Sequence, residues 1–158
     1  MTSMKKMICI AAIIIITGCK TAVTTVPSVV NVNPIVKLTP TEVDPAEKSR
    51  VYELGKRVLN SCKTSKFKRY TTSEATPEVI GNITPEKISR TCQKFRLKYG
   101  DFKDIELVEV IQDNNAKTKI YRYKAKYQRD FVTKELRVTL NDENKISGIK
   151  STDWTDQY

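Results

Sequence analysis

Residues 118–140 read Thr-Lys-Ile-Tyr-Arg-Tyr-Lys-Ala-Lys-Tyr-Gln-Arg-Asp-Phe-Val-Thr-Lys-Glu-Leu-Arg-Val-Thr-Leu, and this stretch decides the fold class. Apolar and polar side chains alternate along it, a period of two that is typical of strands with one buried face. Lys134 is the exception, since it falls on the apolar side. The short link at residues 129–130 predicts that the two halves, 118–128 and 131–140, are antiparallel neighbours.

Two further strands flank this pair. Residues 105–112 and 145–153 show the same character, and polar turns at 113–115 and 141–144 connect them to the central pair. We therefore expect a meander of four antiparallel strands with one apolar face.

Before Gly100 the apolar period is 3.6, which predicts helices. Asp44-Pro45-Ala46-Glu47 is a strong helix start, with a capping Asp, a Pro at the first helical position and a Glu three residues after the cap. Thr76-Pro77-Glu78 and Thr84-Pro85-Glu86 repeat the signal. We expect Gly81 to end the short second helix and Gly100 the third. The fold class is α+β, with N-terminal helices packed on a curled four-stranded antiparallel sheet.

A long capped helix, two shorter helices and a meander resemble the nuclear-transport-factor-two-like, or cystatin-like, fold. More narrowly, the chain resembles small secreted bacterial domains of unknown function. Tyr99-Gly100-Asp101-Phe102-Lys103 and the closing stretch 138–149, with its Lys-Ile turn and Gly, carry the likeness over residues 44–158. It implies a cone of helices and sheet. No catalytic residue comes with it.

Residues 4–19 read Met-Lys-Lys-Met-Ile-Cys-Ile-Ala-Ala-Ile-Ile-Ile-Ile-Thr-Gly-Cys. Two lysines and about ten apolar residues are too few to span a bilayer and are typical of a secretory signal peptide. Ile16-Thr17-Gly18-Cys19 resembles the lipobox of bacterial lipoproteins. That resemblance implies diacylglycerol on the Cys19 sulfur and cleavage after Gly18. The alternative is an ordinary signal peptide with a chance cysteine.

The resemblance also predicts where the mature protein lies. We expect it lipid-anchored in the bacterial cell envelope, outside the cytoplasm. Because Lys20 is not an acidic retention signal, the outer membrane is the expected site if the cell has two membranes.

Residues 19–43 are rich in Thr, Val and Pro and nearly uncharged. Prolines bar a helix and favour extended backbone, so we interpret this segment as a flexible tether that reaches up to about 80 Å. A partly ordered edge strand around residues 28–32 is the alternative. The predicted organisation is a signal peptide (1–18), a lipidated tether (19–43) and an α+β domain (44–158).

The chain is basic, with a net charge of +10, and loss of Lys5 and Lys6 with the signal leaves +8. An exported basic protein meets anionic lipids and cell-wall polymers, although solvated lysines on an ordinary surface produce the same balance. The cluster of Lys63, Lys66, Lys68 and Arg69 fits a phosphate or anionic surface, or a solvated loop.

The cations of 118–128 alternate with tyrosines and so fall on the opposite face of the strand. This arrangement favours a core face with a solvated outer face over a stacking platform, and we expect no nucleic acid partner.

Catalytic chemistry finds little support in the sequence. The chain has no His, which excludes His-based triads and most zinc sites. Ser65-Lys66-Phe67-Lys68 matches an S-x-x-K spacing by chance, since its partner motifs are missing. We predict no catalytic residue, metal or cofactor, and hence no enzyme. The alternatives are an isomerase or dehydratase of the same fold, which needs a carboxylate and a tyrosine in the cone, and a structural or inhibitory envelope protein.

After processing, Cys62 and Cys92 remain, both on predicted core faces. They form either a disulfide between the first and third helices or two small buried apolar side chains. The expected function is binding of an apolar small ligand or an envelope protein, with the membrane reached through the lipid on Cys19. The predicted cleft lining is Tyr99, Tyr121, Tyr123 and Tyr127.

Overall fold

The computed structural model describes residues 34–64, 66–131 and 133–157. The predicted signal peptide, the lipobox-like stretch with Cys19 and the suggested edge strand at 28–32 lie outside these ranges. In chain order the elements are β1 (Ile35–Leu38), α1 (Pro45–Thr64), α2 (Pro77–Asn82), α3 (Pro85–Tyr99), β2 (Phe102–Asp113), β3 (Thr118–Tyr127), β4 (Lys134–Leu140) and β5 (Ile146–Asp153).

The sheet is antiparallel throughout, in the order β1-β2-β3-β4-β5. The predicted α+β class is confirmed, but the count of four strands is wrong. The fifth strand is β1, whose Ile35 lies opposite Asp113 of β2 and whose Leu38 lies opposite Val110. This strand falls within the segment 19–43 that we interpreted as a tether. Pro34 and Pro40 flank the strand, and an edge position tolerates such neighbours.

The helix starts follow the predicted caps. The Asp44 carboxylate accepts a hydrogen bond from the Glu47 N–H at 2.8 Å, and the Thr76 and Thr84 hydroxyls accept at 3.4 Å from Val79 and Lys87. Gly100 follows α3 with φ 76°, a conformation that favours glycine. Helix α2 differs from expectation because it runs past Gly81 to Asn82.

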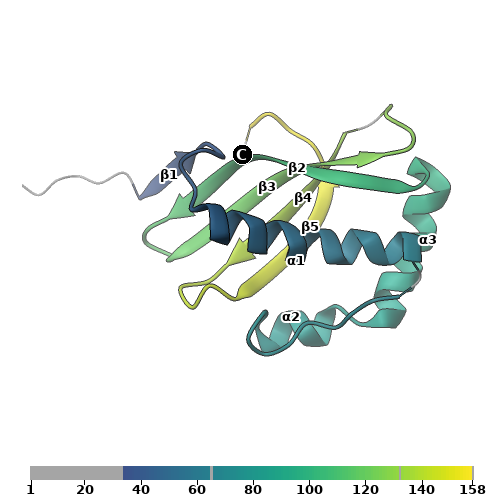
Figure 1. The fold of residues 1–158 in the computed structure, drawn as a ribbon, viewed down its shortest axis with the longest axis horizontal. Coiled ribbons are helices and arrows are strands. Elements are labelled where there is room, and N and C mark those ends of the chain that lie inside the picture. The colour runs from purple at the N-terminus through teal and green to yellow at the C-terminus, as the bar shows by residue number, and fades with distance from the viewer. Residues whose placement is uncertain (1–33, 65, 132, 158) are drawn as a thin grey trace, which may run out of the picture. The chain divides into compact units, whose positions relative to one another are not determined.

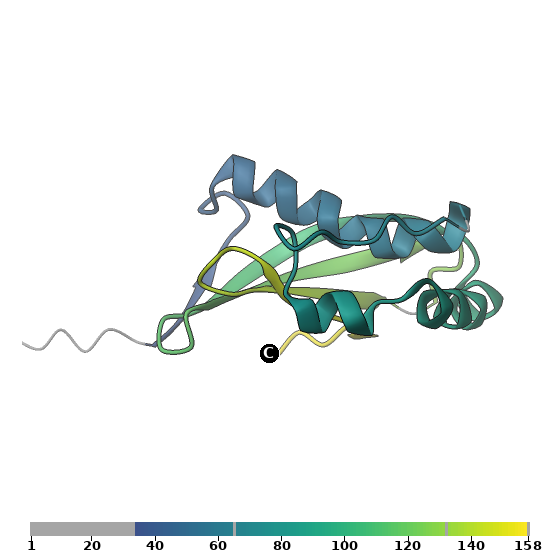
Figure 2. The same cartoon turned by 90° about the horizontal axis from the view of Figure 1, so that it is seen from below.

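Helix α1 lies along the sheet and contacts β2 and β4 (Figure 1). At Gly55 the helix lies close to β4, since a Cβ atom there would lie 2.9 Å from Val138 Cγ2. Helix α3 packs against the C-terminal part of α1, and both views place α3 and β1 at opposite ends of the described domain (Figures 1 and 2). The side chains of Val51, Leu54, Tyr121, Tyr123, Leu136 and Val138 fill the interface between α1 and the sheet and are nearly or fully buried.

None of the helices in the described ranges has the length and apolar character that crossing a membrane requires.

Candidate functional site

The four tyrosines predicted to line a cleft form part of the core instead. Tyr121 and Tyr123 are 0% exposed, Tyr99 5% and Tyr127 6%. None of them lines either of the two hollows described below. The physical reason is that α1 lies close against β2 and β4, so the large rings fill the space that a cone would leave open. We therefore replace this set as the candidate site.

The hydroxyl groups of these tyrosines differ in their hydrogen bonding. The Tyr121 hydroxyl donates a hydrogen bond to the Glu47 carboxylate, which also accepts from Lys119 Nζ at 2.9 Å. The hydroxyls of Tyr123 and Tyr127 are buried and have no hydrogen-bond partner among the described residues. Burial raises the pKa of both phenols above its ordinary value.

An aromatic cluster closes the core at the α3 end. Tyr127 lies between Tyr99, Phe95 and Phe102, with ring centroids 5.6 to 6.2 Å apart. This cluster also explains why Lys134, the exception in the strand pattern, lies on the apolar face. Its stem is buried, its Nζ lies 5.4 Å from the Tyr99 ring centroid, and the same Nζ donates to Asp153 at 2.6 Å.

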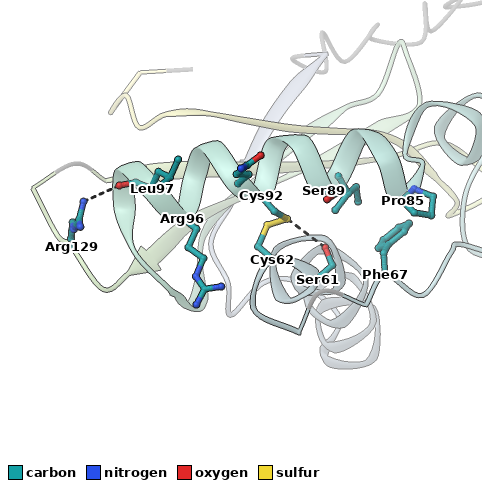
Figure 3. Close-up of a pocket in the computed structure, with 11 residues that line it drawn as sticks. Ser61, Cys62, Phe67, Pro85, Ser89, Cys92, Arg96, Leu97 and Arg129 are labelled. Atoms are coloured by element: carbon teal, nitrogen blue, oxygen red, sulfur yellow. Dashed lines mark hydrogen bonds between the residues drawn. A yellow bond between two sulfur atoms is a disulfide. The ribbon is translucent and has the colours of Figure 1, made fainter.

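A hollow of about 700 Å³ lies between α1 and α3. Figure 3 shows the Cys62–Cys92 disulfide in its wall, with an S–S distance of 2.03 Å. We call it the α1–α3 hollow. Its lining is Ser61, Cys62, Phe67, Pro85, Ile88, Ser89, Cys92, Gln93, Arg96, Leu97 and Arg129.

A second, smaller hollow of about 190 Å³ adjoins the first, because Cys62, Ile88 and Cys92 line both. Its remaining wall is largely apolar and includes Leu136 and Ile149 of the sheet. The disulfide thus borders two hollows, one lined by polar and apolar side chains alike and one lined mainly by apolar side chains.

Two arginines, Arg96 and Arg129, line the α1–α3 hollow. Arg129 Nη1 donates to the carbonyl oxygens of Leu97 and Lys98 at 3.0 and 3.2 Å, which caps the C-terminal end of α3. Arg96 pairs with Asp101 at 3.1 Å while its side chain stays 63% exposed. Two guanidinium groups therefore stand at one end of the hollow.

Arg69 and Arg90 lie near the other end of α3. The pKa of Glu86 is below its ordinary value, first because its own backbone N–H donates to the carboxylate, then through Thr84, and then because Arg69 and Arg90 are close. Phe67 lines the hollow beside Pro85, so the 66–69 segment lies next to the first turn of α3 (Figure 3). The predicted basic cluster is thus next to α3, which carries five basic side chains and one acidic side chain.

The outer face of the sheet departs from the expectation of a solvated cationic face. Arg122 is 0% exposed, and so is Glu135 on the neighbouring strand β4. Glu135 Oε1 accepts from Arg122 Nε at 2.6 Å and from Arg137 Nε at 2.7 Å. Arg122 also donates to Glu109 and to the Thr155 carbonyl oxygen, the latter at 2.7 Å.

Trp154 covers this charge network. Its ring centroid lies 4.5 Å from Arg122 Cζ and 4.8 Å from Lys124 Nζ. Burial acts to raise the pKa of Glu135, but the hydrogen bonds from Arg122 and Arg137 hold it below the ordinary value. The sequence signal that could have revealed the network is a Trp after the last strand together with carboxylates on neighbouring strands.

Fold and site together define an α+β domain with a basic hollow beside a disulfide. No protein-family model, curated protein or solved structure matches the chain. Over the described ranges, no cluster of three or more Cys, Asp or Glu side chains is arranged to hold a metal ion. The functional argument therefore rests on the hollow and its charges.

Proposed function

We propose that this chain is a bacterial lipoprotein, anchored through Cys19, whose folded domain is a non-catalytic binding module of the cell envelope. The lipobox-like Ile16-Thr17-Gly18-Cys19 after a short apolar run supports the anchor. The cystatin-like resemblance of residues 44–158 supports a small secreted domain.

The α1–α3 hollow is the observation that carries the binding role. Its volume of about 700 Å³ suits a small ligand or a short segment of a larger one. Ser61, Ser89 and Gln93 offer hydrogen bonds, and Phe67 and Leu97 offer apolar contact. With Arg96 and Arg129 at one end, the lining favours a ligand with an acidic group over the purely apolar ligand expected from the sequence.

An enzyme of this fold needs a carboxylate beside a tyrosine in a cavity. Glu47 and Tyr121 form such a pair, but neither residue lines either hollow, and Lys119 already neutralises the carboxylate. We therefore favour binding over catalysis.

Native mass spectrometry of the chain from Lys20, purified under mild conditions, tests this proposal. We expect a copurified molecule of acidic character that dissociates at higher collision energy. Ser89→Trp places a large ring in the hollow and should abolish the adduct, whereas Ser49→Trp, on an exposed position of α1 outside the hollow, should keep it. A bare chain, or equal loss in both variants, contradicts binding in the hollow.

A further inference from the structure

The positive charge of the folded chain is concentrated at one end. Residues 34–157 contain 25 basic and 18 acidic side chains, an excess of seven. Residues 63–69 have four basic side chains and no acidic one, and α3 has five basic and one acidic. These two segments, which we call the basic end, therefore carry an excess of eight, and the rest of the domain is close to neutral.

All nine cations of the basic end are exposed. Among the described residues only Arg96 has an ion-pair partner, Asp101. Like charges held this close repel one another, and an anionic partner relieves that repulsion. The nine are Lys63, Lys66, Lys68, Arg69, Lys87, Arg90, Lys94, Arg96 and Lys98.

Large apolar side chains are exposed at the same end. Leu97 is 73% exposed and Phe131 is 62% exposed. Both lie near the C-terminal end of α3, because Leu97 belongs to its last turn and the Phe131 ring packs 6.1 Å from that of Tyr99. Arg90, Lys94 and Leu97 follow each other at helical spacing and so lie along one side of α3.

We infer that the basic end is a docking surface for an anionic lipid bilayer. Its Lys and Arg side chains contact headgroup phosphates, and Leu97 and Phe131 enter the interface. A bilayer fits better than a single rigid ligand. The cations are exposed and largely unpaired, so their side chains can adjust to the positions of mobile headgroups. Transfer of the exposed apolar side chains from water into the bilayer interface adds a favourable free energy.

The geometry allows the anchored protein to dock in this way, a step that rests on the proposed lipid at Cys19. Residues 20–34 span at most about 50 Å. Helix α1 has 20 residues, a length of about 30 Å, and it runs between the β1 end and the α3 end (Figures 1 and 2). The segment before β1 is thus long enough for α3 to rest on the bilayer that holds the lipid.

Vesicle sedimentation of the chain from Lys20, which has no lipid, tests the docking surface separately from the anchor. The probes are phosphatidylcholine vesicles with and without 30% phosphatidylglycerol. We expect binding only to the anionic vesicles, weakened by salt. Since each cation near such a surface contributes about fivefold, Arg90→Gln with Lys94→Gln should reduce the partition coefficient about 25-fold.

The matched control removes two exposed cations elsewhere, with Lys117→Gln and Lys150→Gln, and leaves the same net charge. It should change binding severalfold less than the α3 pair. Leu97→Ser should weaken binding without changing its salt dependence. Equal losses in the two charge pairs, binding to neutral vesicles, or no binding to anionic vesicles overturns the inference. A negative result in this assay does not bear on the acylation of Cys19 or on ligand binding in the hollow, which are tested by separate measurements.

Discussion

At the residue scale, the ion pair of Arg57 and Glu74 joins α1 to the loop before α2. Two hydrogen bonds of 2.7 and 2.9 Å link the guanidinium to the carboxylate. These bonds lower the pKa of Glu74 from 4.5 to about 2. Because the folded-state pKa is the lower one, the pair stabilises the fold above pH 4.5 and loses its effect as the pH falls toward 2.

We predict that Glu74→Gln lowers the free energy of unfolding by about 1 kcal/mol at neutral pH. Urea denaturation at pH 7, 4 and 2.5 measures the difference between variant and wild type. The difference should shrink between pH 4.5 and 2. If the difference in the free energy of unfolding is the same at pH 7 and pH 2.5, the ion pair with Arg57 is not the source of the stabilisation.

The buried network on the outer face gives a second prediction. Arg122→Leu leaves Glu135 buried without its main partner, so we expect a loss of about 3 kcal/mol. Adding Glu135→Leu removes that uncompensated charge, and Arg137 is exposed enough to be hydrated. The double variant should therefore be more stable than Arg122→Leu alone in the same denaturation assay. A double variant that is less stable argues against this explanation.

Side-chain direction at this scale could be predicted from the sequence, but side-chain surroundings could not. Alternation placed Tyr121 and Tyr123 on the inner face, and both are buried there. The same alternation put Arg122 on the outer face and made it look solvated. Its burial depends on Trp154, 32 residues later in the sequence, and alternation says nothing about such a distant contact.

At the element scale, the approach of α1 to β4 depends on Gly55. Alanine at this position gains about 1 kcal/mol of helix propensity, but its Cβ would lie 2.9 Å from Val138 Cγ2. Val138 is fully buried and stiff, so we expect Gly55→Ala to destabilise the protein by about 1–3 kcal/mol.

The control for that change is Gly81→Ala in α2, where an added Cβ meets nothing within 4 Å. It should be neutral or stabilising by up to about 1 kcal/mol. Thermal unfolding of the two variants distinguishes packing from propensity. Destabilisation of both by the same amount contradicts the packing explanation.

The disulfide between α1 and α3 gives a further prediction. Cys62 and Cys92 are 30 residues apart, and a cross-link of that span stabilises a fold by about 3.5 kcal/mol in the chain-entropy model. Replacing both with Ala should lower the free energy of unfolding by about that amount. Intact mass should rise by two hydrogens when the wild type is reduced. No mass change on reduction means that the thiols are not bridged.

Elements with local signals were predicted well. The three capped helices start where Asp44, Thr76 and Thr84 indicate, and the meander follows Gly100. Strand β1 was missed because four residues between prolines carry too little local signal. Its existence depends on pairing with β2, more than 70 residues away, and that information is not local.

At the scale of the whole molecule, the proposed membrane docking depends on the distribution of charge more than on the net charge. The sequence shows an excess of positive charge, but only the packing of α3 beside residues 66–69 brings most of that charge to one end. This packing also forms the α1–α3 hollow. The hollow could not be predicted because it depends on where two helices cross, whereas the proposed lipobox rests on a local pattern of four residues, Ile16-Thr17-Gly18-Cys19.

The measurement that tests the account most directly is the intact mass of the full-length protein extracted from the membranes of bacterial cells. We predict a chain that begins at Cys19 and carries the added mass of a diacylglyceryl group. Cys19→Ser should prevent both the addition and the membrane retention. A chain that retains residues 1–18, or one cleaved elsewhere without added lipid, contradicts the proposal of a lipid-anchored binding protein.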